Sequence, residues 1–80
     1  MKFIFTATRK DSNRLHLLER DVNNTSTPFV ICWNYDTSYR SWDWGTYCTT
    51  LKQALSAFNQ KIVEHGFTDI FEGYLEKNHT

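Results

Sequence analysis

The sequence predicts an α+β fold, a two-layer sandwich in which a four-stranded antiparallel meander sheet packs against one C-terminal amphipathic helix. Three observations support this prediction. Over the first half of the chain, apolar and polar residues alternate with the period of two that is typical of strands. From residue 50 the apolar residues recur with the period of about 3.6 that is typical of a helix. The chain has 80 residues, which predicts a single domain over residues 1–80.

The first two strands are predicted at about residues 2–8 and 14–22. Both segments are rich in β-branched, aromatic and leucine residues, and residues 9–13 between them have the polar composition of a turn. If the two strands pair as a hairpin across this turn, Ala7 lies opposite Leu15. The sheet is therefore expected to begin with an antiparallel hairpin.

A second hairpin is predicted at about residues 28–36 and 41–48. The polar run before it is typical of a loop, and Pro28 suits the first position of a strand, where a missing N–H does least harm. Gly45 indicates a bend or bulge in the last of the four strands. This second hairpin completes the predicted sheet.

A helix is predicted at about residues 50–65. Thr50 and Gln53 form a capping-box pattern at its start, and Gly66 suits the left-handed conformation that ends many helices. Its apolar stripe comprises Leu51, Ala54, Leu55, Phe58 and Ile62. This stripe is expected to cover one face of the sheet.

The segment after the helix is predicted as a short terminal helix at about residues 69–76. Asp69 suits its N-cap, with Glu72 three residues later. A fifth strand is the alternative for the same residues.

The alternation also assigns the two faces of the sheet. The face that the helix would cover collects Phe3, Phe5, Ala7, Leu15, Leu17, Phe29, Ile31 and Trp33. The opposite face would present Ile4, Thr6, His16, Leu18, Arg20, Val30, Cys32 and Asn34. Its mixed apolar and polar character, with no second helix to cover it, is typical of a protein interface. Two alternatives are that the C-terminal segment folds back over this face, or that it forms a homodimer.

Tyrosine and tryptophan are concentrated around the second hairpin, and aromatic residues make up 16% of the chain. These residue types dominate the binding energy of many protein interfaces. The predicted partner-binding residues are Tyr35, Asp36, Tyr39, Arg40, Trp42, Asp43 and Trp44. We therefore expect a small non-enzymatic protein-interaction module or inhibitor that occludes its partner, and its size suggests an origin in phages or mobile elements.

Single-stranded nucleic acid is the alternative partner. Nine Lys and Arg balance nine Asp and Glu, so the chain lacks the strongly basic character of a duplex-DNA binder. A local patch that holds phosphates while tryptophans stack on bases would still suffice. The residues for this role are Arg9, Lys10, Arg14, Arg20, Trp42 and Trp44.

No catalytic, cofactor or metal site is predicted. Cys32, Cys48 and His16 are residue types found in nucleophile–base pairs and zinc sites, but their spacing matches neither pattern. The three glycines are isolated, so a Gly-rich phosphate-binding loop is not indicated. Two cysteines and a start without a signal-peptide pattern predict a cytoplasmic protein with free thiols, and no membrane-spanning segment is expected.

Overall fold

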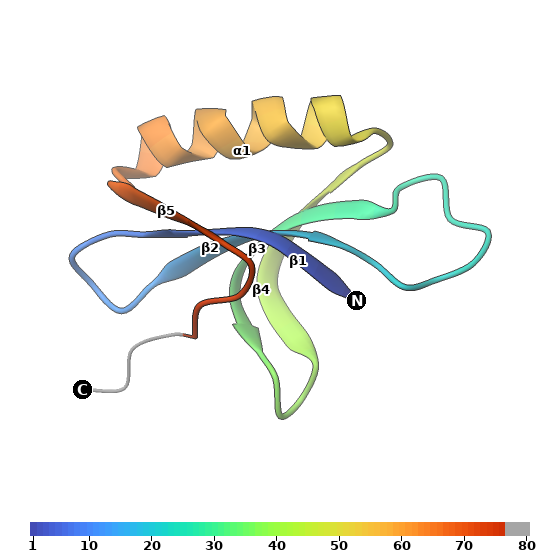
Figure 1. Cartoon of the computed structure of the whole chain (residues 1–80), viewed down its shortest axis with the longest axis horizontal. Helices are drawn as coiled ribbons and strands as arrows, with labels where there is room; N and C mark the ends of the chain where they lie inside the picture. Colours follow the sequence, from blue (N-terminus) through green and yellow to red (C-terminus); the bar gives the residue numbers. More distant parts are fainter. Residues whose placement is uncertain (77–80) are drawn as a thin grey trace.

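The computed structural model describes residues 1–76 and confirms an α+β architecture. Its elements are β1 (Lys2–Thr8), β2 (Arg14–Glu19), β3 (Phe29–Asp36), β4 (Ser41–Cys48), α1 (Leu51–His65) and β5 (Asp69–Glu72). The five strands form one antiparallel sheet in the order β4-β3-β2-β1-β5, and Figure 1 shows α1 lying across one of its faces. Within residues 1–76, α1 is too short and too polar to span a membrane.

The predicted short helix at residues 69–76 is wrong, because Asp69–Glu72 forms the fifth strand. This strand pairs antiparallel with β1, where Thr8 lies opposite Asp69. Backbone hydrogen bonds from Thr68 N to Thr8 O (2.8 Å) and from Gly73 N to Ile4 O (2.9 Å) extend the pairing at both ends. The extended conformation is favoured over a helix because it pairs with the outer edge of β1, whose backbone N–H and C=O groups would otherwise lack partners in the sheet.

Strand β2 is shorter than predicted, since it ends at Glu19 rather than near residue 22. The backbone N–H of Arg20 donates to Pro28 O over 2.7 Å and closes the loop that leads into β3. Asp21 and Val22 beyond it are exposed. These loop residues become important below, because they border a cavity.

Helix α1 has the predicted caps. The Thr50 side chain accepts a hydrogen bond from Gln53 N, and the Gln53 side chain accepts one from Thr50 N, so the capping box is complete. Gly66 ends the helix in the left-handed conformation, with φ at 71° and its N–H donating to Ile62 O. The chain turns there and enters β5.

The helix and one face of the sheet enclose the larger of two cores, which we call the helix-side core. Its buried members are Ala7, Leu15, Leu17, Ile31, Cys48, Ala54, Phe58 and Phe67. The predicted pairing of Ala7 with Leu15 is confirmed, and Phe5 lies opposite Leu17 in the same register. Leu51 departs from the predicted stripe, because it is exposed at the first position of the helix.

The predicted core face is wrong for Phe3, since an irregularity in β1 between Phe3 and Phe5 shifts the register by one residue. A slip of one residue moves a side chain to the other face of a sheet. Phe3 therefore lies on the face opposite α1, whereas Ile4, which the alternation places there, packs against the helix-side core.

The face opposite α1 carries a second core instead of an open surface. Its buried members are Leu18, Val30, Cys32 and Tyr35, with Phe3, Trp42 and Tyr74 packed against them. Figure 1 shows the β3–β4 hairpin bending away on the side opposite α1, and the chain after β5 turning to the same side. The chain itself therefore covers much of the face that the sequence leaves open.

Candidate functional site

A clasp centred on Thr6 fastens the C-terminal segment over the second core. The Thr6 hydroxyl donates to Gly73 O (2.8 Å) and accepts from Leu75 N (3.1 Å). It also lies 3.0 Å from Nδ1 of His16, and both side chains are fully buried. The ring of Tyr74 stacks on His16 with 5.3 Å between centroids. The centre of the predicted open face is thus unavailable to a partner.

The clasp fixes the protonation of His16. Because the single Thr6 hydroxyl proton is donated to Gly73 O, Nδ1 of His16 must carry a proton and donate to the hydroxyl. Nε2 is buried without a partner among the described residues, as suits the unprotonated nitrogen of a neutral ring. Burial, helped by the positive charge of Arg14, lowers the pKa of His16 to about 4.

Cys32 and His16 lie opposite each other on neighbouring strands but are not arranged as an activated nucleophile. Burial raises the pKa of the Cys32 thiol to about 12, while that of His16 is lowered. Both shifts favour neutral groups, whereas a cysteine nucleophile needs a thiolate. Cys48 belongs to the helix-side core, so the sheet separates it from this pair. Among residues 1–76 no three potential metal ligands gather.

A bulge at Trp44 sends the two tryptophans of β4 to different sides. Cys32 lies opposite Gly45 and Trp33 lies opposite Asp43, so Trp44 is the extra residue, with φ at 34°. The sequence alternation, by contrast, would have placed Trp42 and Trp44 on one face. This bulge adjoins Gly45, where an irregularity was predicted.

Trp42 turns toward the second core. Its ring stacks on Tyr35 with 6.0 Å between centroids and 24° between planes. Its Nε1 lies so near Gly45 that a Cβ at that position would come within 2.8 Å of it. Gly45 therefore makes the space that the indole needs, and Trp42 is half-buried rather than presented to solvent.

Trp44 turns to the side of α1 and is 84% exposed. Together with Trp33 and His65 it lines a groove of about 400 Å³. Within this groove the rings of Trp33 and His65 meet edge to face, with centroids 4.9 Å apart. We call this surface the Trp44 groove. No pattern in the sequence predicts that residues from β3, β4 and the end of α1 meet in one groove.

Arg9 holds the end of α1 in place behind the Trp44 groove. Its guanidinium lies 5.2 Å above the ring centroid of Trp33 and 4.8 Å above that of Phe67. It donates from Nη1 to His65 O (2.6 Å) and from Nε to the Asp11 carboxylate (3.0 Å). These contacts make Trp33 and His65 a preformed part of the surface.

The tip of the β3–β4 hairpin is exposed and its turn is fixed by Asp36. The Oδ1 of Asp36 accepts from Ser38 N (2.8 Å) and Tyr39 N (3.2 Å), so this carboxylate serves the turn. Tyr39 is 82% exposed, and Arg40 and Asp43 are also exposed. Of the predicted partner-binding residues, only Tyr35 and Trp42 are turned inward.

The predicted nucleic-acid residues do not form one track. Arg9 and Lys10 lie in the turn between β1 and β2, whereas Arg20 lies beyond the far end of β2. Arg14 is buried and donates to the backbone oxygens of Asp11 and Asn13. These cations therefore lie in different parts of the fold.

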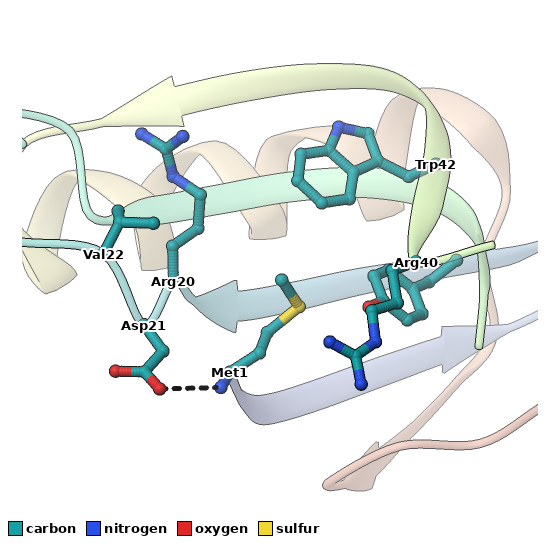
Figure 2. Close-up of a pocket in the computed structure, with 7 residues that line it drawn as sticks. Met1, Arg20, Asp21, Val22, Arg40 and Trp42 are labelled. Atoms are coloured by element: carbon teal, nitrogen blue, oxygen red, sulfur yellow. Dashed lines mark ion pairs between the residues drawn. The ribbon is translucent and has the colours of Figure 1, made fainter. Parts of the chain in front are cut away.

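A cavity of about 570 Å³ lies beside Trp42 on the face opposite α1, with Tyr35 in its lining. Figure 2 shows the other lining residues, which are Met1, Arg20, Asp21, Val22, Arg40 and Trp42. We call it the Trp42 cavity. Of its lining, only Tyr35, Arg40 and Trp42 were predicted as partner-binding residues and Arg20 as a nucleic-acid contact.

No protein-family model, curated protein or solved structure gives a significant match to this chain.

Proposed function

We propose that the protein is a non-enzymatic protein-interaction module that binds its partner through the Trp44 groove. The observation that carries this proposal is that Trp44 is exposed to solvent on a strained segment of backbone. Trp44 is 84% exposed, and its φ of 34° lies in a region that residues other than glycine rarely adopt. Neither feature stabilises the isolated fold, and strain of this kind persists mainly at functional sites.

The Trp44 groove offers a partner both a projection and a hollow. The indole of Trp44 inserts into a pocket of the partner, while an apolar side chain of the partner enters the groove that Trp33, Trp44 and His65 line. Because Arg9 already fixes Trp33 and His65, little side-chain ordering is required on binding. The protein acts by occluding the partner surface that receives Trp44.

The hairpin tip extends this surface. Tyr39, at the tip, is another large aromatic side chain of the β3–β4 hairpin that is exposed to solvent. Asp43, next to Trp44 in the bulge, is exposed and supplies a charge at the rim. Polar rim groups of this kind fix orientation and the rate of association more than affinity.

Replacing Trp44 by alanine is expected to weaken partner binding by about 2 kcal/mol or more, which is roughly thirtyfold in Kd. The partner is first captured from the source cell with the wild-type chain, and its affinity for each variant is then measured by calorimetric titration. Stability changes little, because the exposed indole contributes little to either core.

Val63→Ala is the matched control, since Val63 is 81% exposed but does not line the Trp44 groove. This variant is expected to bind like the wild type. Thermal melts followed by circular dichroism establish that both variants are folded. If Trp44→Ala binds every captured partner with wild-type affinity, the proposed surface is wrong.

A further inference from the structure

The Trp42 cavity lies on the face of the sheet opposite α1 and shares no lining residue with the Trp44 groove. Its volume of about 570 Å³ is within the range of roughly 300–1,000 Å³ found for small-molecule sites. Figure 2 shows Arg20 and Trp42 on opposite sides of it, with the side chain of Met1 between them. The cavity therefore has the size and the mixed lining of a ligand site.

Arg20 is held in place but its charge is not neutralised. Its Nη2 donates to Thr27 O (2.7 Å) and to the hydroxyl of Thr25 (3.1 Å), and its guanidinium lies 5.0 Å above the ring centroid of Tyr47. Its Nε is buried without a hydrogen-bond partner among the described residues. Within residues 1–76, Arg20 forms no ion pair.

Arg40 brings a second guanidinium to the same cavity. In the part of the chain that the structure describes, its side chain forms no ion pair and no hydrogen bond, and it is exposed. Its φ of 52° is again one that non-glycine residues rarely adopt. Two arginines that form no ion pair with any described carboxylate line one cavity, which indicates an anionic ligand, and phosphate suits the planar guanidinium fork.

The rest of the lining suits a flat group with hydrogen-bond donors. Stacking on Tyr35 fixes the plane of the Trp42 indole, which forms one wall of the cavity. Asp21 supplies a carboxylate that is 94% exposed and lies 4.0 Å from the amino group of Met1. An aromatic face binds planar rings, and an acidic side chain accepts hydrogen bonds from ribose hydroxyls.

We propose that the Trp42 cavity binds a nucleoside monophosphate. The base stacks against Trp42 and the phosphate contacts Arg40 on the same side of the cavity, while Arg20 on the other side adds a second positive charge and Asp21 accepts a hydrogen bond from the ribose. A nucleotide is the ligand class that combines an anionic group, a flat ring and neighbouring hydroxyl donors. This binding is independent of the Trp44 groove, so either proposal can fail without the other.

Titration of the isotope-labelled chain with adenosine monophosphate, followed by NMR, tests this proposal. The chain is used with Met1 as its first residue, because Met1 lines the cavity. The indole N–H signal of Trp42 and the backbone signals of residues 20–22 are expected to shift, while the indole signals of Trp33 and Trp44 stay in place. Adenosine alone and inorganic phosphate alone are expected to bind about tenfold more weakly or worse.

Arg40→Gln should weaken adenosine monophosphate binding about tenfold, since it removes one charged contact to the phosphate. Lys10→Gln is the matched control, because it removes one exposed positive charge in the turn between β1 and β2, away from the cavity. Its affinity should remain within about twofold of the wild type.

Three results would overturn the proposal. The first is an unshifted Trp42 signal at saturating nucleotide. The second is an equal loss of affinity in Arg40→Gln and Lys10→Gln, which would mean unspecific charge attraction. The third is inorganic phosphate binding as tightly as the nucleotide, which would leave only an anion site at the arginines.

Discussion

Replacing Phe58 by alanine is expected to remove a large part of the stability of the fold. Phe58 is 1% exposed in the helix-side core, and its ring stacks on Phe5 with centroids 6.2 Å apart. Truncating a buried phenylalanine to alanine costs about 3–5 kcal/mol. Since a domain of this size has a total stability of roughly 4–12 kcal/mol, the variant should melt at least about 15 °C below the wild type.

Asn59→Ala is the matched control, because Asn59 follows Phe58 in α1 but is exposed. Its free energy of unfolding should remain within about 0.5 kcal/mol of the wild type. Both values come from urea unfolding followed by circular dichroism. A loss below about 1 kcal/mol in Phe58→Ala would contradict the packing of α1 against the sheet.

Acidification should destabilise the fold through His16. The pKa of His16 is about 4 in the folded protein, against 6.5 for an unperturbed histidine, because the ring is fully buried. The unfolded chain therefore takes up a proton as the pH falls through 6.5, whereas the folded protein takes it up only near pH 4. The stabilising effect is complete above pH 6.5 and is lost between these two values, on the order of 3 kcal/mol in total.

His16→Asn isolates this contribution. The asparagine amide can still donate to the Thr6 hydroxyl from about the position of Nδ1, but it does not titrate. Urea unfolding of both proteins across this pH interval gives the comparison. The wild type should lose stability more steeply than the variant, and parallel profiles would show that His16 is not held neutral by the clasp.

Features set by neighbouring residues were predictable from the sequence. The capping box of Thr50 and Gln53 and the left-handed Gly66 depend on a few consecutive residues, and they define α1. The pairing of Ala7 with Leu15 follows from a short turn and regular alternation. Caps and short turns of this kind can be predicted from the sequence because they depend on neighbouring residues and not on distant parts of the chain.

Features set by register or by distant contacts were not predictable. The irregularities at Phe3 and Trp44 each move side chains to the other face, and alternation alone contains no signal for such a shift. The clasp joins Thr6 to Gly73, which are 67 residues apart in the sequence, so the residues next to either one contain no signal for this contact. For the same reason, the sequence offered cover of the face opposite α1 by the C-terminal segment only as an alternative, which the packing of Tyr74 on the second core bears out.

The candidate site was predicted in part. The β3–β4 hairpin is indeed where exposed aromatic side chains gather, with Tyr39 and Trp44 in solvent. The sequence could not reveal that Trp42 is turned toward the second core, nor that His65 completes the groove from the end of α1. Residue type identified the hairpin, while the bulge decided the direction of each side chain.

Acrylamide quenching of single-tryptophan chains tests the central claim most directly, which is that the bulge separates Trp44 from Trp42. One chain keeps only Trp44, the other keeps only Trp42, and phenylalanine replaces the remaining tryptophans. Since Trp44 is 84% exposed and Trp42 is half-buried against Tyr35, the account predicts a quenching constant several-fold larger for the Trp44 chain. Equal constants, or a larger one for the Trp42 chain, would contradict the account.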